Sequence, residues 1–267
     1  MTMFEAIVRE LDLIEQAEHV RILHCVESGS RAWGFASPDS DYDVRFIYVR
    51  DEDFYLKLEE TRDVIEWKLD DTLDINGWDL KKALRLLKQS NPTLFEWNSS
   101  PLVYRTTDDW KRISQVISGY FLKKKGLYHY LSMARNNYRE YLRGEKVKLK
   151  KYFYVLRPVL ACKWILKHSS PPPMLFEELS DDCLEPEMRS IVDELLRLKK
   201  ETPELGEGDR IAALNDYLER SIENVGRDIL SLPDEDKGGW EELDSLFLSV
   251  LRNDKKIPAR GGENHTD

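Results

Sequence analysis

Residues 20–50 constrain the fold of this chain more than any other stretch. A β-rich apolar run (20–26) ends in Ser28-Gly29-Ser30, and a loop then leads into a second β-rich run that begins at Asp41. Because side chains alternate between the two faces of a strand, Asp41 and Asp43 point to the same side. At roughly 3.3 Å rise per residue the two carboxylates lie about 7 Å apart, close enough to share a divalent cation.

The turn before the loop adds a second functional element. Gly29 allows close approach of the backbone, and Ser30 offers an amide and a hydroxyl to a phosphate group. An acidic pair opposite such a turn predicts a metal-dependent phosphoryl- or nucleotidyl-transfer site. The alternative is an acidic turn before a buried strand, with its charge balanced by Arg45.

The order of these motifs resembles a known family. Gly29-Ser30, followed after about ten residues by Asp41-Tyr42-Asp43-Val44, is similar to the active-site pattern of the DNA polymerase β-like nucleotidyltransferases. The longer stretch SGSRAWGFASPDSDYDVRFIY resembles the predicted RNA-repair-pathway branch, and the resemblance extends through residues 74–92 and 150–164. It implies an α+β fold: a small mixed sheet with flanking helices, the polymerase β-like nucleotidyltransferase core, followed by an all-α helical domain.

The secondary-structure signal divides the chain in the same way. Apolar residues at helical spacing predict a helix over residues 3–17, and β-rich runs predict further strands over 61–69 and 72–76, joined by a turn at Asp70-Asp71. Asp79 is a suitable N-cap for a helix over 80–89. Later amphipathic runs predict helices over 108–122, 126–143, 149–168, 186–201, 208–231 and 240–252.

The loss of strand signal predicts a domain boundary near residue 118. Residues 1–118 would form the catalytic domain, and residues 119–252 a helical domain that, by the resemblance, closes over the nucleotide. Residues 253–267 lack an apolar pattern, which predicts a flexible tail.

Two-metal nucleotidyl transfer needs one ion to activate the attacking hydroxyl and another to hold the triphosphate and the leaving pyrophosphate. A third carboxylate usually joins the first pair. Asp74 matches the family's position, whereas Asp79 is the second candidate, because helix capping explains it more simply. The resemblance therefore implies two Mg²⁺ ions, with Asp41, Asp43 and Asp74 as catalytic metal ligands.

Nucleotide contacts are expected from two regions of the chain. Gly29 and Ser30 would hold the triphosphate, with Arg31 and Arg45 near enough in sequence to neutralise phosphate charge. Arg45 shares a face with Asp43, however, so an ion pair with that residue is the alternative. In the later segment the resemblance implies phosphate contacts from a lysine; the candidates on this helix are Lys150, Lys151, Tyr154 and Arg157, and an ordinary basic face is the alternative.

The charge distribution bears on the partner. A net charge of −10 argues against a protein that coats nucleic acid indiscriminately. Residues 123–167, however, contain thirteen Lys or Arg and two acidic residues, a local net charge of +11, so the rest of the chain carries −21. Such a segment suits a polyanionic substrate, and solvated helix faces explain it equally well.

Other classes of protein are disfavoured by missing features. The sequence has no P-loop, no Gly-x-Gly-x-x-Gly and no Gly-x-Ser-x-Gly motif. No stretch approaches the roughly 18–20 apolar residues of a membrane span. The amphipathic, acidic N-terminus is unlike a signal peptide, and three scattered cysteines without a Cys-x-x-Cys pair predict reduced thiols. These features predict a cytoplasmic protein without a structural zinc.

The sequence therefore predicts an enzyme, a Mg²⁺-dependent nucleotidyltransferase that moves a nucleoside monophosphate from an NTP such as ATP to an acceptor hydroxyl and releases pyrophosphate. An RNA end is the favoured acceptor. A non-catalytic nucleotide- or RNA-binding module is the alternative from another class, and a protein or small molecule is the alternative acceptor. The preferred NTP and the oligomeric state have no signature in the sequence.

Overall fold

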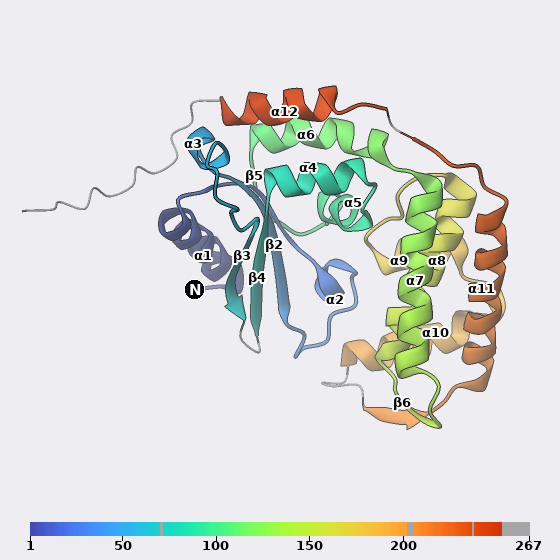
Figure 1. The fold of residues 1–267 in the computed structure, drawn as a ribbon. Coiled ribbons are helices and arrows are strands. Elements are labelled where there is room, and N and C mark those ends of the chain that lie inside the picture. Colours follow the sequence, from blue (N-terminus) through green and yellow to red (C-terminus); the bar gives the residue numbers. More distant parts are fainter. Residues whose placement is uncertain (70–71, 202–205, 237, 253–267) are drawn as a thin grey trace, which may run out of the picture.

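The computed structural model describes residues 1–69, 72–201, 206–236 and 238–252 (Figure 1). Among these residues, five strands form one mixed sheet in the order β3-β4-β2-β1-β5. The strands are β1 (Arg21–Glu27), β2 (Tyr42–Val49), β3 (Val64–Leu69), β4 (Leu73–Asp79) and β5 (Val103–Thr106). Strand β5 was not predicted, because it is short and is defined by its pairing with β1. The predicted turn at Asp70-Asp71 lies outside the described residues.

The parallel pair β2 and β4 positions the acidic residues. All other strand pairs in this sheet are antiparallel, whereas β2 and β4 run side by side in one direction, with Asp43 aligned with Asp74. The chain returns from the end of β2 through α3 (Glu52–Tyr55) and β3, so that β4 can start beside the start of β2. The two acidic residues consequently meet at the same end of the sheet.

Helix α1 (Met3–Glu18) covers one face of the sheet, as the helical spacing over residues 3–17 predicts. A capping box starts it, in which Thr2 and Glu5 exchange hydrogen bonds between side chain and backbone at 2.8 and 3.2 Å. Its apolar face packs into a cluster with the β2 side chains on that face of the sheet. This cluster includes Ile7, Leu11, Ile14, Val44, Phe46, Tyr48 and Ile75.

The opposite face of the sheet carries the larger core. Three helices contribute to it: α4 (Leu80–Lys88), α5 (Pro92–Asn98) and α6 (Asp108–Ile117). Because Asp41, Asp43 and Arg45 alternate with the residues that pack on α1, they belong to this opposite face. Helix α4 begins where the sequence predicted it, at Asp79, whose carboxylate accepts the backbone N–H of Lys81 at 2.7 Å.

The remaining chain is mainly helical and stands beside the sheet, on the side where α2 (Gly29–Ala32) lies (Figure 1). Its elements are η1 (Ser118–Tyr120), α7 (Lys123–Tyr141), α8 (Lys151–His168), α9 (Phe176–Cys183), α10 (Pro186–Glu201), α11 (Ala212–Leu230), and a small antiparallel sheet of β6 (Lys146–Lys148) and β7 (Glu207–Asp209). Helix α9 and the small sheet were not predicted. The expected α+β class, a mixed sheet followed by helices, is confirmed.

The last helix, α12 (Glu241–Leu251), returns to the first part of the chain. It packs on α4, and the Val250 carbonyl accepts a hydrogen bond from Arg21 of β1 at 3.2 Å. The division into residues 1–118 and 119–252 stays a prediction, and residues 253–267 lie outside the described residues. Within the described part of the chain, no helix has both the length and the apolar character needed to cross a membrane.

Candidate active site

A polar cavity of about 410 Å³ lies where the loop before β2 meets helices α8 and α10. Gly29 and Ser30 of α2 line it together with Asp41 and Asp43. The far wall comes from distant segments of the chain, with Lys150 and Tyr154 at the start of α8 and Lys199 near the end of α10. The structure therefore brings the predicted turn, the acidic pair and part of the later basic segment to one cavity.

Gly29 fits this position because of its backbone conformation and its neighbour. Its φ is +59°, and an added Cβ would lie 2.0 Å from a carboxylate oxygen of Asp43. Two backbone contacts fix the approach: the Ser28 N–H donates to the Asp43 carbonyl at 2.8 Å, and the Asp43 N–H donates to Glu27 at 2.7 Å. These hydrogen bonds hold the turn against the strand that carries Asp43. Gly29 therefore lies close to Asp43, as the predicted close approach of its backbone requires.

Arg45 links the carboxylates of the two parallel strands. Its guanidinium donates to Asp43 at 3.1 Å and to Asp74 at 2.7 Å, and also to the Asp74 carbonyl at 3.0 Å. The pairing of Arg45 with Asp43, stated above as the alternative to phosphate binding, is present. The side chains of Asp43 and Asp74 remain about one-third exposed, at 33% and 32%. Arg45 therefore offsets the repulsion between them without closing either off from solvent.

Burial and like charges raise the pKa of two acidic groups here, Asp43 and Glu27. Burial raises the pKa of Asp43, and the negative charges of Asp74 and Asp41 raise it further against the opposing effect of Arg45. Directly behind, the fully buried Glu27 accepts hydrogen bonds from the Asp43 N–H and the Tyr104 hydroxyl. Burial raises the pKa of Glu27 as well. A cation among these groups would relieve the accumulated negative charge.

The carboxylate oxygens at this site suit a divalent cation. Carboxylate oxygens are the ligands that Mg²⁺ prefers, and one oxygen of Asp74, Oδ1, is buried without a hydrogen-bond partner among the described residues. In that part of the chain, however, no three His, Cys, Asp or Glu side chains are already gathered closely enough to hold a metal ion. The residues fit a site that a bound ligand completes, since Mg²⁺ often uses one or two carboxylates plus substrate phosphates.

Asp79, the second candidate for the third carboxylate, has a structural role. It is buried at the opposite end of β4 from Asp74. Its carboxylate caps α4 and accepts the Tyr55 hydroxyl at 2.8 Å. The parallel register leaves Asp74 as the acidic residue beside Asp43.

Arg31 holds the loop that carries Asp41. Its guanidinium donates to the Ser40 carbonyl at 2.6 Å and the Asp41 carbonyl at 3.0 Å, and lies over the Tyr42 ring at 3.7 Å from its centroid. These contacts order the loop. A direct contact of Arg31 with phosphate stays a prediction.

The predicted residues of α8 have different surroundings. Lys150 and Tyr154 line the cavity with the acidic pair, whereas the Lys151 ammonium lies over the rings of Tyr141 and Tyr154, at 4.1 and 4.3 Å from their centroids. Burial lowers the pKa of Lys151, and the neighbouring Lys150 lowers it further. The two adjacent lysines therefore separate into one that faces the cavity and one that packs on aromatic rings.

Arg157 is placed differently from the expectation that it faces the cavity. Its side chain is 3% exposed, pairs with Glu96 at 2.8 Å and lies over the Trp33 ring at 4.7 Å from the centroid. Residues six apart in an α-helix point about 120° away from each other. Lys151 and Arg157 therefore lie on different sides of α8, and Arg157 is one of its buried residues. Arg157 instead joins α8 to α5 and to Trp33, the residue after α2.

Several residues at the cavity were missed by the sequence reasoning. Lys199 donates to the Ser37 hydroxyl at 2.7 Å, and that hydroxyl is 2.9 Å from the Ser40 hydroxyl. Asp39 and Trp33 complete the same wall. In the sequence, residues 37–40 predict only an ordinary turn. Lys199 is one of several cations in a predicted helix of mixed charge. No local pattern distinguishes them, because only the approach of α10 to this loop brings them together.

Acidic residues pair with many of the cations in the basic segment, residues 123–167. At least five of its cations form ion pairs with acidic residues from outside the segment: Lys124 with Asp234, Lys146 with Asp209, Arg157 with Glu96, Lys163 with Glu185 and Lys167 with Asp182. The local charge of +11 therefore overstates the positive surface available to a polyanion.

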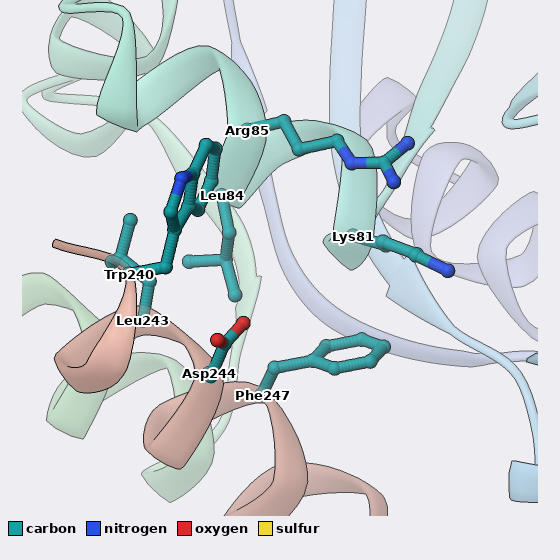
Figure 2. A pocket seen from close by; sticks show the side chains of 7 residues that line it. All are labelled: Lys81, Leu84, Arg85, Trp240, Leu243, Asp244 and Phe247. Carbon is teal, nitrogen blue, oxygen red and sulfur yellow. The ribbon is translucent and has the colours of Figure 1, made fainter.

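A second cavity, of about 250 Å³, lies between α4 and α12. Figure 2 shows Lys81 and Arg85 of α4 extending to the same side, with Trp240 and Phe247 from the α12 side across the cavity. This cavity is next to the start of α4, which follows the end of β4. Asp43, in contrast, lies near the start of the parallel strand β2, and Asp41 lies in the loop just before that strand. The second cavity is therefore separate from the acidic site.

Comparison with known proteins identifies the family. The family described as "RlaP: RNA repair pathway DNA polymerase beta family" matches residues 3–249. The chain belongs to this family. Membership of this family supports nucleotidyl transfer as the general chemistry of the protein.

The chain is also similar to one curated protein and to one solved structure. The "Uncharacterized protein YcgL" of Bacillus subtilis (strain 168) is 45% identical over 251 residues, which cover 93% of this chain and 96% of that protein. The crystal structure of a nucleotidyltransferase-like protein from Exiguobacterium sibiricum 255-15 is 15% identical, with a TM-score of 0.31 and coverage of 94% of this chain and 89% of that one.

Proposed function

We propose that this protein is a Mg²⁺-dependent nucleotidyltransferase that moves a nucleoside monophosphate from an NTP to an acceptor hydroxyl, with an RNA end as the favoured acceptor. The acceptor hydroxyl releases its proton to water and its oxygen forms a bond to the α-phosphorus. The bond from that phosphorus to the oxygen that bridges it to the β-phosphorus breaks, and pyrophosphate leaves. The observation that carries the proposal is the meeting of Gly29-Ser30 and the Asp41/Asp43 pair with Lys150 in one cavity.

The charges around the cavity are distributed as a metal-bound triphosphate requires. Asp41 and Asp43 lie on one side, with Asp74 next to Asp43, and would hold Mg²⁺. The bound ions would activate the acceptor hydroxyl and hold the triphosphate. Lys150 on the opposite side suits the negative phosphate oxygens, because an ammonium donates charge-assisted hydrogen bonds to phosphate.

Ser30 and Gly29 would bind the triphosphate through the hydroxyl and the backbone. The cavity wall at Tyr154 is exposed enough to contact a nucleotide, since this side chain is 41% exposed and lies edge-on to Trp33 at 6.1 Å between ring centroids. Burial raises the pKa of Tyr154, and Asp43 and Asp41 raise it further, so its hydroxyl stays protonated and can donate a hydrogen bond at neutral pH.

The direct test is transfer of label from α-labelled NTPs in the presence of Mg²⁺. RNA ends, proteins and small alcohols should be offered as acceptors. Asp41→Asn and Asp43→Asn, which keep the shape and remove the charge, should each abolish transfer while the protein stays folded. Asp63→Asn, which changes an acid whose ion-pair partner is Lys82, is the matched control. Transfer by the Asp41→Asn/Asp43→Asn double variant at the wild-type rate would disprove the assignment.

A second function, nucleotide or RNA binding without catalysis, is favoured by one observation. Arg45 already pairs with Asp43 and Asp74 and balances one of their two negative charges, so part of the acidic charge is compensated without a metal ion. Calorimetry separates the two functions. Nucleotide binding that is the same with Mg²⁺ and with a chelator supports the binding module, whereas binding that requires Mg²⁺ supports the enzyme.

The acceptor distinguishes the remaining possibilities. The family description supports RNA. The ion pairs between the basic segment and acidic residues outside it weaken the case for a broad nucleic-acid-binding surface there. Protein and small-molecule acceptors therefore belong in the same assay. Label recovered in RNA from a mixed RNA and protein extract would support the RNA end, and label in protein would overturn it.

A further inference from the structure

Lys199 connects two segments that are far apart in the sequence. It lies in the last turn of α10, and its ammonium donates to the hydroxyl of Ser37, in the loop before β2, at 2.7 Å. That hydroxyl is in turn within 2.9 Å of the Ser40 hydroxyl, and Ser40 also accepts the Ser37 N–H at 2.9 Å. A single lysine therefore ties α10 to the loop that leads into Asp41.

The surroundings of this ammonium leave its charge incompletely paired. The side chain is half-buried in the cavity wall, and within the described residues no carboxylate approaches it within ion-pair distance. A hydroxyl satisfies one of the three donors of an ammonium group. Burial lowers the pKa of Lys199, and Asp39 opposes that effect from a distance. A half-buried cation with this environment gains more from an anion than a solvated lysine does.

We propose that Lys199 is a phosphate-binding residue, which exchanges its hydrogen bond to Ser37 for one to a phosphate oxygen of the nucleotide. This inference rests on the proposed function. Lys199 and Lys150 line the same cavity from α10 and α8, so a bound triphosphate joins both helices to the loop and α2. The exchange replaces a hydrogen bond from the ammonium to a neutral hydroxyl with one to an anionic phosphate oxygen, so that both partners of the bond are charged.

The adjacent residue provides a matched control. Lys200 lines a neighbouring cavity of about 190 Å³, which shares Trp33 with the active-site cavity but not Lys199, Asp41 or Asp43. Lys199→Met and Lys200→Met thus remove the same charge from neighbouring positions of one helix. Lys199→Arg keeps the charge, and Ser37→Ala removes the hydroxyl that Lys199 now contacts.

The experiment measures binding of Mg²⁺–inorganic triphosphate and of Mg²⁺–ATP by calorimetry, with thermal unfolding as a check on folding. Lys199→Met should weaken binding of both ligands by about 10- to 100-fold, the range for one charge-assisted hydrogen bond. Lys199→Arg should recover part of the loss, and Lys200→Met should bind as the wild type does. Ser37→Ala should bind inorganic triphosphate at least as tightly as the wild type, because the ammonium is released from its present partner.

Each outcome bears on the inference. Wild-type affinity in Lys199→Met overturns it and leaves the proposed function standing. Equal weakening by Ser37→Ala and Lys199→Met also overturns it, because the Lys199–Ser37 hydrogen bond would then act only by ordering the loop. A wild-type protein that binds neither ligand rules out the inference and the proposed function together. Triphosphate binding that depends on Lys199 without any nucleotidyl transfer supports the inference and refutes the catalytic proposal.

Discussion

Asp43 and Asp74 occupy the same register position in neighbouring parallel strands, and Arg45 donates a hydrogen bond to each of them. Two neighbouring carboxylates repel each other, and either a bound proton or a nearby cation relieves the repulsion. In this structure the cation is a guanidinium from the same strand as Asp43. A metal ion would act on the same two groups.

Removal of Arg45 should show how much its positive charge stabilises the neighbouring Asp43 and Asp74. We expect Arg45→Met to lower the free energy of unfolding by about 1–3 kcal/mol in a chelating buffer, because the two carboxylates lose their charged hydrogen-bond donor. Mg²⁺ should restore part of the loss and should bind the variant more tightly than the wild type. Urea denaturation with and without Mg²⁺ measures both effects. An equal response of variant and wild type to Mg²⁺ would show that Arg45 and the ion do not share these ligands.

Substitution of Gly29 should displace Asp43. In Gly29→Ala the new Cβ would lie 2.0 Å from a carboxylate oxygen, at a backbone φ of +59° that side chains rarely adopt. We expect a loss of about 1–3 kcal/mol in stability and a fall of about 100-fold in transfer rate, since misplacing a reacting group by about 1 Å has an effect of that order. Gly119→Ala, with no atom within 4 Å of the added Cβ, is the control and should change neither quantity.

The neighbouring lysines at the start of α8 should differ in their effect on nucleotide. Lys150→Met should raise the KM for NTP by about tenfold, because its side chain lines the cavity that contains Asp41 and Asp43. Lys151→Met should have a smaller effect, since that ammonium lies on the rings of Tyr141 and Tyr154. Steady-state kinetics of the two variants provide the comparison. A larger effect from Lys151 would restore it as the phosphate ligand.

The buried pair of Arg157 and Glu96 should matter for stability. Glu96 accepts hydrogen bonds from Arg157 at 2.8 Å and from the Tyr130 hydroxyl at 2.7 Å. Glu96→Gln leaves a buried guanidinium without its counter-ion, so we expect a loss of about 3 kcal/mol. The double variant Glu96→Gln/Arg157→Met should lose less than the sum of the two single changes. Additive losses in chemical denaturation would indicate that the two side chains act independently.

His24 should make the protein sensitive to mild acid. It is buried against Trp110, and burial lowers its pKa to about 4 from 6.5. Between these two pH values the unfolded chain binds a proton that the folded protein does not, so stability falls as the pH is lowered, by up to about 3 kcal/mol from this group. His24→Phe keeps a ring beside Trp110 and removes the titration. Its stability should vary less between pH 6.5 and 4; an unchanged slope would exclude His24 as the cause.

The sequence by itself determined the features that depend on neighbouring residues. Asp41 and Asp43 line one cavity as their spacing predicted, although β2 begins only at Tyr42. The 3.6-residue period identifies the buried face of α1, and Asp79 caps α4 as expected. The ordered combination of Gly29-Ser30 and the acidic pair was specific enough to identify the family. The residues behind each of these predictions lie close together in the sequence, so the sequence alone shows the pattern.

Only the tertiary structure decided which distant groups meet. Asp74 faces Asp43 because β2 and β4 are parallel and in register, and Lys199 reaches the cavity because α10 packs beside the loop before β2. Arg157 has the same residue type as a phosphate ligand, but its ion pair with Glu96 puts it in the core. A charged side chain binds a ligand or stabilises the fold according to which groups lie next to it and how deeply it is buried. Both depend on how the whole chain packs.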